Sequence, residues 1–91
     1  MRAIRFATEA YLDLRKLRAH DRVIIMDAIE KHLAEPNLRL GRKIKLLRLT
    51  DGEFIYRLRV GEHRVFFEIV HEGIVVRSIR HKGRRKTEEI L

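Results

Sequence analysis

The sequence contains no cysteine, one proline and only five glycines in 91 residues. Disulfides and thiolate-based zinc sites are therefore excluded, and the five histidines share no metal-ligand spacing. The lack of cysteine suits a reducing cytoplasm. The proline and the glycines stand between patterned segments, so no linker or low-complexity stretch divides the chain. We expect a single cytoplasmic domain over residues 1–91, with no metal and no cofactor.

Long apolar runs are also missing. No segment approaches the ~20 consecutive apolar residues that span a bilayer. The first residues, Met1 to Arg5, lack the basic-then-apolar pattern of a signal peptide. We therefore expect neither a membrane association nor a signal peptide. The overall content of 45% hydrophobic and 37% charged residues is typical of a globular protein.

The charge balance is strongly one-sided, with a formal net charge of +8 and an isoelectric point near 10.6. Such a balance favours an anionic partner, which could be nucleic acid, an acidic protein segment or an anionic membrane surface. Positive charge that merely keeps the protein in solution is the simpler explanation. The uneven distribution of the cations along the chain argues against it.

The first half of the chain has the pattern of a strand followed by two helices. Residues 2–7 alternate as a strand does, and Thr8 offers a hydroxyl N-cap for a helix whose first turn carries Glu9. Asp21 is a candidate N-cap for a second helix, which Pro36 would end. Because few residues separate them, the helices should form an antiparallel hairpin. Their apolar positions recur at helical spacing: Ala10, Tyr11, Leu14 and Leu17, then Ile25, Met26, Ile29 and Leu33.

The second half changes to a period of two. Residues 54–60 alternate apolar side chains with Ile55, Arg57 and Arg59, and three turn signals follow one another at Asp51-Gly52, Gly61-Glu62 and Glu72-Gly73. We predict an α+β fold, in which an N-terminal strand and an antiparallel helical hairpin pack on one face of a mostly antiparallel four- to five-stranded sheet. The other face carries the arginines and should see solvent or a ligand. The place of the first strand in the sheet is left open.

Cations gather in the second half, on strands and after them. A hairpin between residues 54–60 and 64–70 can bring Arg64 close to Arg57 and Arg59. The segment 77–86 adds arginines, lysines and His81. Such a cluster repels itself until phosphates neutralise it, and the planar guanidinium binds two phosphate oxygens at once. The alternative is an ordinary solvated charged surface.

Two segments resemble the RelE/ParE family of toxins from bacterial and archaeal toxin–antitoxin pairs: Tyr56 to Ile69, YRLRVGEHRVFFEI, and Val75 to Arg84, VVRSIRHKGR. The order of the N-terminal strand and helices extends the resemblance over essentially the whole chain. It implies a toxin held inactive in a hetero-oligomer with a cognate antitoxin. RelE-like members cut messenger RNA in the ribosomal A site, with the RNA 2′-hydroxyl as nucleophile and without a metal. ParE-like members poison DNA gyrase.

The resemblance also assigns roles by position. It implies a catalytic set of Arg64 on the scissile phosphate, His81 as acid or base, and Arg85 after the last strand. His81 suits proton transfer because imidazole titrates near neutral pH; alternatively, it is a strand-end histidine that bonds a backbone group or Glu68. The remaining cations are RNA-binding candidates: Arg57, Arg59, Arg80, Lys82, Arg84 and Lys86.

One feature departs from the family pattern. Many RelE-like nucleases end with a tyrosine that stacks on or activates the RNA, whereas residues 84–91 contain no aromatic side chain. Tyr11 and Tyr56 lie on apolar stripes and are expected in the core. This departure keeps three functions open: a histidine-driven nuclease, a gyrase poison, or a basic module that acts only within a repressor complex. The expected partners are the antitoxin with the ribosome and messenger RNA, or alternatively gyrase.

Overall fold

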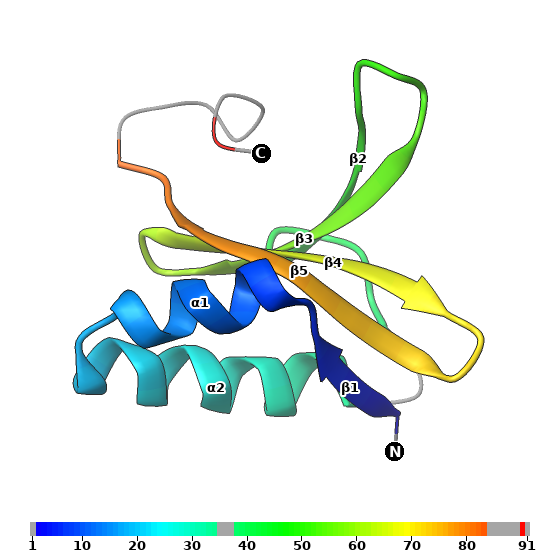
Figure 1. Ribbon diagram of the computed structural model, residues 1–91. Coiled ribbons are helices and arrows are strands. Elements are labelled where there is room, and N and C mark those ends of the chain that lie inside the picture. The colour runs from blue at the N-terminus through cyan, green and yellow to red at the C-terminus, as the bar shows by residue number, and fades with distance from the viewer. Residues whose placement is uncertain (1, 35–37, 84–89, 91) are drawn as a thin grey trace.

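The computed structural model describes residues 2–34, 38–83 and residue 90, which form two helices and a five-stranded sheet (Figure 1). The sheet order is β1-β5-β4-β3-β2. No helix within the described residues is long and apolar enough to cross a membrane. The elements are β1 (Ala3–Phe6), α1 (Thr8–Lys16), α2 (Ala19–Leu33), β2 (Ile44–Arg48), β3 (Phe54–Val60), β4 (His63–Val70) and β5 (Gly73–His81).

The predicted α+β class and the antiparallel meander from β2 to β5 are confirmed. The sequence left the place of the first strand open, and the structure puts β1 parallel to β5 at the edge of the sheet. Both helices cover one face of the sheet, as Figure 1 shows. The main core lies between these layers, where Ile25, Ile29 and Leu33 of α2 meet strand residues such as Leu58 and Val76.

β4 is buried on both faces, and this shapes the functional half of the molecule. The consecutive residues Phe66 and Phe67 are both fully buried, although neighbouring strand residues point to opposite faces. Phe67 belongs to the core under the helices. Phe66 belongs to a second, smaller cluster with Ile55 and Ile90 on the other face. The face away from the helices is therefore partly covered, which the sequence did not predict.

The expected helix caps are wrong. α1 begins at Thr8 itself, with Ala7 at the N-cap, and α2 begins at Ala19, with Arg18 at the N-cap; neither cap makes a side-chain hydrogen bond. The carbonyls at the end of α1 find another partner, because Arg22 donates to the carbonyl oxygens of Leu14 (3.0 Å) and Leu17 (2.9 Å). Arg22 of α2 thus satisfies carbonyls at the C-terminal end of α1, which is a separate contact from the N-terminal caps that were expected. Pro36, the expected helix stop, lies outside the described residues.

Tyr11 was expected in the core and is 54% exposed. Ala10 and Leu14 are the residues of α1 that are buried, and Tyr11 lies about 100° around the helix from Ala10. The nine-residue helix buries only a narrow stripe, and Tyr11 falls outside it. Tyr56 is half-buried and stacks on Phe67, with ring centroids 5.3 Å apart, as a residue packed against the core should.

The β1–β5 pairing depends on Gly73. It has φ +154°, and a Cβ built there would lie 2.1 Å from the carbonyl oxygen of Ala3. We predict that Gly73→Ala lowers the free energy of unfolding by at least about 2 kcal/mol, because β1 must move away. Urea denaturation measures the change. Gly41→Ala is the matched control, since nothing lies within 4 Å of its Cβ position; equal stabilities of the two variants would contradict the assignment.

Candidate nucleic-acid interface

Three of the predicted site residues converge on the side of the sheet away from the helices. Arg59 of β3 lies directly opposite Arg64 of β4 in the register, and Arg57 lies opposite Phe66. Directly opposed residues share a face, so all three arginines lie on the face of the Phe66 cluster. We call this surface, defined by Arg57, Arg59 and Arg64, the arginine face. The expected convergence of the strand arginines is confirmed.

The arginine face is less open than expected. Arg59 is exposed, whereas Arg57 and Arg64 are only 5% and 7% exposed. The reason is their place in the sheet: β3 and β4 are interior strands, and the Phe66 cluster occupies the same face. The expectation that these two side chains simply face solvent is therefore wrong. Arginine is almost never this buried without a partner.

Backbone carbonyls hold both buried guanidinium groups. Nη2 of Arg57 donates to the carbonyl oxygen of Arg42 (2.9 Å). Nη1 of Arg64 donates to the carbonyl oxygens of Gly61 (2.8 Å) and His63 (2.9 Å) in the β3–β4 turn. Nε of each arginine is buried and has no hydrogen-bond partner among the described residues. A buried donor without an acceptor is unfavourable, and a ligand oxygen would reach either Nε only after the arginine side chain moved outward.

The electrostatics of the cluster point the same way. Burial lowers the pKa of Arg57 from its ordinary value, and the cations of Arg64 and Arg59 lower it further. Burial and Arg59 likewise lower the pKa of Arg64, against the opposing effect of Glu62. Three like charges therefore share a partly desolvated surface, where repulsion is weakly screened. A phosphate bound there relieves the repulsion and supplies acceptors.

Lys45 is a basic residue of this face that sequence reasoning missed. It is exposed on β2 and lies directly opposite Arg57 in the register. The signal was present, since Lys45 alternates with Ile44 and Leu46 on an expected strand. It could not be used without knowing that β2 pairs with β3 in this register. Lys45 extends the positive surface toward the sheet edge.

His81 is not brought onto the arginine face. It pairs with His63, which in turn pairs with Val60, a residue packed against the helix-side core. The rings of His63 and His81 meet edge to face, with centroids 5.2 Å apart. They line a cavity of about 400 Å³ at the rim of the helix layer, together with Asp21. The expectation that His81 borders the arginine face is wrong, because its register position puts it on the opposite face.

The surroundings of His63 disfavour its charged form. Burial lowers the pKa of His63, and His81 and Arg64 lower it further, whereas Asp21 and Glu62 raise it. Both histidines nevertheless stand at the same end of the sheet as Arg59 and Arg64, since His63 follows the β3–β4 turn and His81 is paired with His63. The two histidines and the two arginines therefore lie at the same end of the sheet but on opposite faces.

Arg80 has an internal role in the fold. Its guanidinium forms ion pairs with Glu9 and, at 2.7 Å, with Asp13 of α1. The same Asp13 oxygen accepts the backbone N–H of Ile79 at 2.8 Å. Although Arg80 lies opposite Arg64 in the register, its charge is neutralised by α1. This network ties α1 to the half of β5 that has no strand partner on that side.

The remaining predicted residues lie at or beyond the end of β5. The backbone N–H of Lys82 donates to the carbonyl oxygen of Glu62 (2.7 Å), which continues the β4–β5 pairing. Arg84, Arg85 and Lys86 lie outside the described residues. Within residues 2–34, 38–83 and 90, no group of three His, Asp or Glu side chains could hold a metal ion.

The sequence and the fold both match known toxins. The family model "ParE toxin of type II toxin-antitoxin system, parDE" matches residues 4–86. No curated protein matches the sequence. A chain of the RelB–RelE antitoxin–toxin complex from Methanococcus jannaschii is 26% identical, with 86% of this chain and 90% of that chain covered and a TM-score of 0.62.

Two further solved structures share this architecture. A chain of the toxin–antitoxin complex RelBE2 from Mycobacterium tuberculosis is 26% identical over 88% of this chain and 96% of that chain, with a TM-score of 0.70. A chain of the intact RelBE complex from E. coli is 19% identical over 92% and 100%, with a TM-score of 0.59, and shows a likeness of fold. With the family match over residues 4–86, these findings establish that the chain belongs to the RelE/ParE family of type II toxins.

Proposed function

We propose that this toxin cleaves messenger RNA on the ribosome, with the arginine face as the binding site for the reacting phosphate. The observation that carries the proposal is the convergence of Arg57, Arg59 and Arg64 on one face of the sheet, where Nε of Arg57 and of Arg64 lacks an acceptor among the described residues. Exposed Arg59 stands directly opposite Arg64. Together they offer several N–H donors to one phosphodiester, as a polyanion site requires.

In the proposed reaction the 2′-oxygen of a ribose attacks the adjacent phosphorus, and the bond to the leaving 5′-oxygen breaks. The products are a 2′,3′-cyclic phosphate and a 5′-hydroxyl. The 2′-hydroxyl loses a proton and the 5′-oxygen gains one, so no cofactor is needed. Negative charge grows on the phosphorane oxygens, and Arg64 together with Arg85 would stabilise it. Arg57, Arg59, Lys82, Arg84 and Lys86 would bind the flanking phosphates.

In this proposal His81 transfers one of the two protons. Because His81 lies on the helix side of the sheet, RNA bound at Arg59 and Arg64 must pass over the end of β5 to reach it. This path is short, because the backbone N–H of Lys82 donates to the carbonyl oxygen of Glu62 and so holds the end of β5 beside the β3–β4 turn. Arg80 would contribute to RNA binding only if phosphate competed with Glu9 and Asp13 for its guanidinium.

A cognate antitoxin completes the proposal. The M. jannaschii, M. tuberculosis and E. coli structures are all complexes of a toxin with its antitoxin. The helix layer of this chain exposes large apolar side chains that suit such a partner: Tyr11, Leu12, Val23 and Ile24. An antitoxin with an acidic or amphipathic segment that folds on binding would cover them and stabilise the chain. The toxin and its antitoxin would both reside in the cytoplasm.

Gyrase poisoning is the second candidate. The matching family model carries the ParE description, and His81, the residue best suited to proton transfer, lies on the face opposite the arginines. A poison needs the basic surface without an acid and a base. Both candidates therefore use the same fold and differ in whether proton transfer occurs.

The first prediction concerns Arg64. In cell-free translation the wild-type protein should leave cut messages on ribosomes, and Arg64→Ala should slow cutting by at least about 100-fold, since a stabilising donor is lost. Arg64→Lys should recover part of the rate, because it restores the charge without the planar fork. Arg15→Ala, at an exposed arginine of α1, is the control and should cut normally. Thermal unfolding checks that Arg64→Ala is folded. Intact messages with the wild-type protein would contradict the proposal.

The second prediction separates the two histidines. His81→Gln should lose cutting, whereas His63→Gln, which alters the neighbouring ring of the same pair, should retain most of it. Both substitutions remove an imidazole from the same cavity, so their effects on packing are matched. Equal rates in the two variants would show that His81 does not transfer the proton.

The third prediction addresses gyrase. If the toxin acts on RNA, a DNA supercoiling assay should show gyrase working at its normal rate at a toxin concentration that stops translation. Trapped, cleaved DNA would support the alternative candidate. Arg64→Ala is tested in both assays. The assay in which the wild-type protein is active and Arg64→Ala is not identifies the target.

A further inference from the structure

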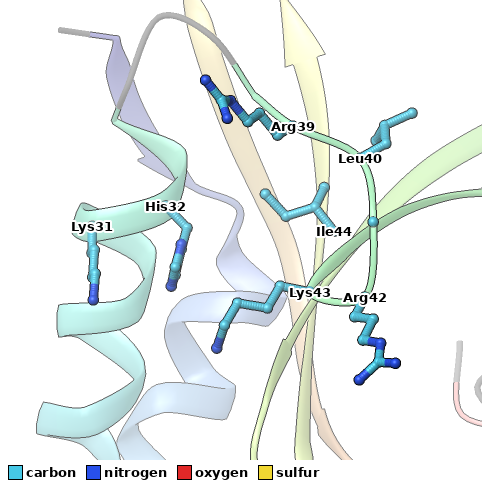
Figure 2. Close-up of a pocket in the computed structure, with 8 residues that line it drawn as sticks. Lys31, His32, Arg39, Leu40, Arg42, Lys43 and Ile44 are labelled. Carbon is cyan, nitrogen blue, oxygen red and sulfur yellow. The ribbon is translucent and has the colours of Figure 1, made fainter.

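A second basic site lies between the C-terminal end of α2 and the segment that precedes β2. It is a cavity of about 420 Å³. Lys31 and His32 come from the last turn of α2, and Lys43 and Ile44 come from the opposite wall (Figure 2). Arg39 lies at the upper end of the cavity, and Arg42 is directed away from α2. Five of the residues that line the cavity can therefore carry positive charge.

No carboxylate balances these cations among the described residues. The described lining contains no Asp or Glu, and the ion pairs found in residues 2–34 and 38–83 involve only Arg77 and Arg80. The C-terminal end of a helix carries partial negative charge, which Lys31 and His32 offset. As far as the described lining goes, the cavity is thus a cationic hollow without an internal counter-ion, and an anion would fill that role.

The cavity adjoins the arginine face through two residues. The carbonyl oxygen of Arg42 accepts the hydrogen bond from buried Arg57 (2.9 Å), and that of Lys43 accepts the backbone N–H of Arg59 (2.8 Å). The segment that forms one wall of the cavity therefore also holds two arginines of the arginine face. A ligand charged at regular intervals can occupy both sites at once, whereas a single small anion can occupy only one.

We propose that this cavity, lined by Lys31, His32, Arg39 and Lys43, binds the phosphate backbone of the RNA strand at a point removed from the reacting phosphate. The inference rests on the proposed function, because it concerns the same RNA. The cavity acts as a second anchor that fixes the direction of the strand across the sheet edge. Contacts of this kind position a nucleic acid without reading its bases.

His32 reports directly on occupancy. Burial lowers its pKa, and the cations of Lys43 and Lys31 lower it further. A phosphate bound beside these lysines offsets their charge, so bound RNA should raise the pKa of His32. Titration of its imidazole by NMR, with and without a short single-stranded RNA, measures the change. An unchanged pKa at saturating RNA would overturn the proposal.

Salt dependence gives the main test. The double variant Lys31→Ala/Lys43→Ala should bind the same RNA more weakly, and the slope of log affinity against log salt should fall by about 1.4, or about 0.7 for each lost phosphate contact. Lys16→Ala/Arg18→Ala is the matched control: it removes the same charge from two exposed residues at the far end of the helix layer. The control should keep the wild-type slope. Equal slopes in the two double variants would overturn the proposal.

A further arm separates RNA from an acidic protein segment. If polyglutamate bound in a way that depended on Lys31 and Lys43, while RNA binding did not, the cavity would be a protein-docking site and the proposal would be wrong. Cleavage is scored separately. Failure of the proposed nuclease function would appear as intact messages with the wild-type protein, whereas failure of this inference leaves cutting normal and the salt slope of the lysine variant unchanged.

Discussion

Two buried guanidinium groups, with no carboxylate partner among the described residues, are the constraint on which the functional half of this molecule depends. Burial lowers the pKa values of both Arg57 and Arg64; Arg64 and Arg59 lower that of Arg57 further, and Arg59 lowers that of Arg64 further. The fold compensates only in part, through backbone carbonyls at Arg42, Gly61 and His63. Nε of each of these two arginines has no acceptor among the described residues. A polyanionic ligand supplies such acceptors and neutralises the charges, so its binding to this surface is favourable.

The rest of the architecture keeps this surface available. Both helices pack on the opposite face and bury the main core there. β1 and the ion pairs of Arg80 with α1 secure β5, so the last strand is held from the helix side. The segment before β2 serves two sites at once, since its carbonyls hold Arg57 and Arg59 while its side chains line the cavity at α2. Positive charge is thereby concentrated on the arginine face and at the β2 edge of the sheet.

The sequence predicted the layers, the meander and the meeting of Arg57, Arg59 and Arg64, because each follows from a period of two and short turns. It could not predict burial of Arg57 and Arg64, which share a face of the sheet with a cluster in which Ile90, from the far end of the chain, packs with Ile55 and Phe66. The position of Lys45 opposite Arg57 and the face on which His81 lies both depend on strand register, which periodicity alone does not determine. The neutralisation of Arg80 required the position of α1, which only packing decides. Predictions from local sequence patterns failed at residues whose contacts come from a segment distant in the sequence.

Replacement of Arg57 by methionine, followed by thermal unfolding with and without a short single-stranded RNA, tests the central claim most directly. The substitution removes one desolvated charge and keeps most of the side-chain volume. The account predicts that free Arg57→Met is at least as stable as the wild-type protein and gains clearly less stability from RNA. A variant that is less stable by more than about 1 kcal/mol when free, yet equally stabilised by RNA, would show that Arg57 is structural and that the arginine face is not a polyanion site.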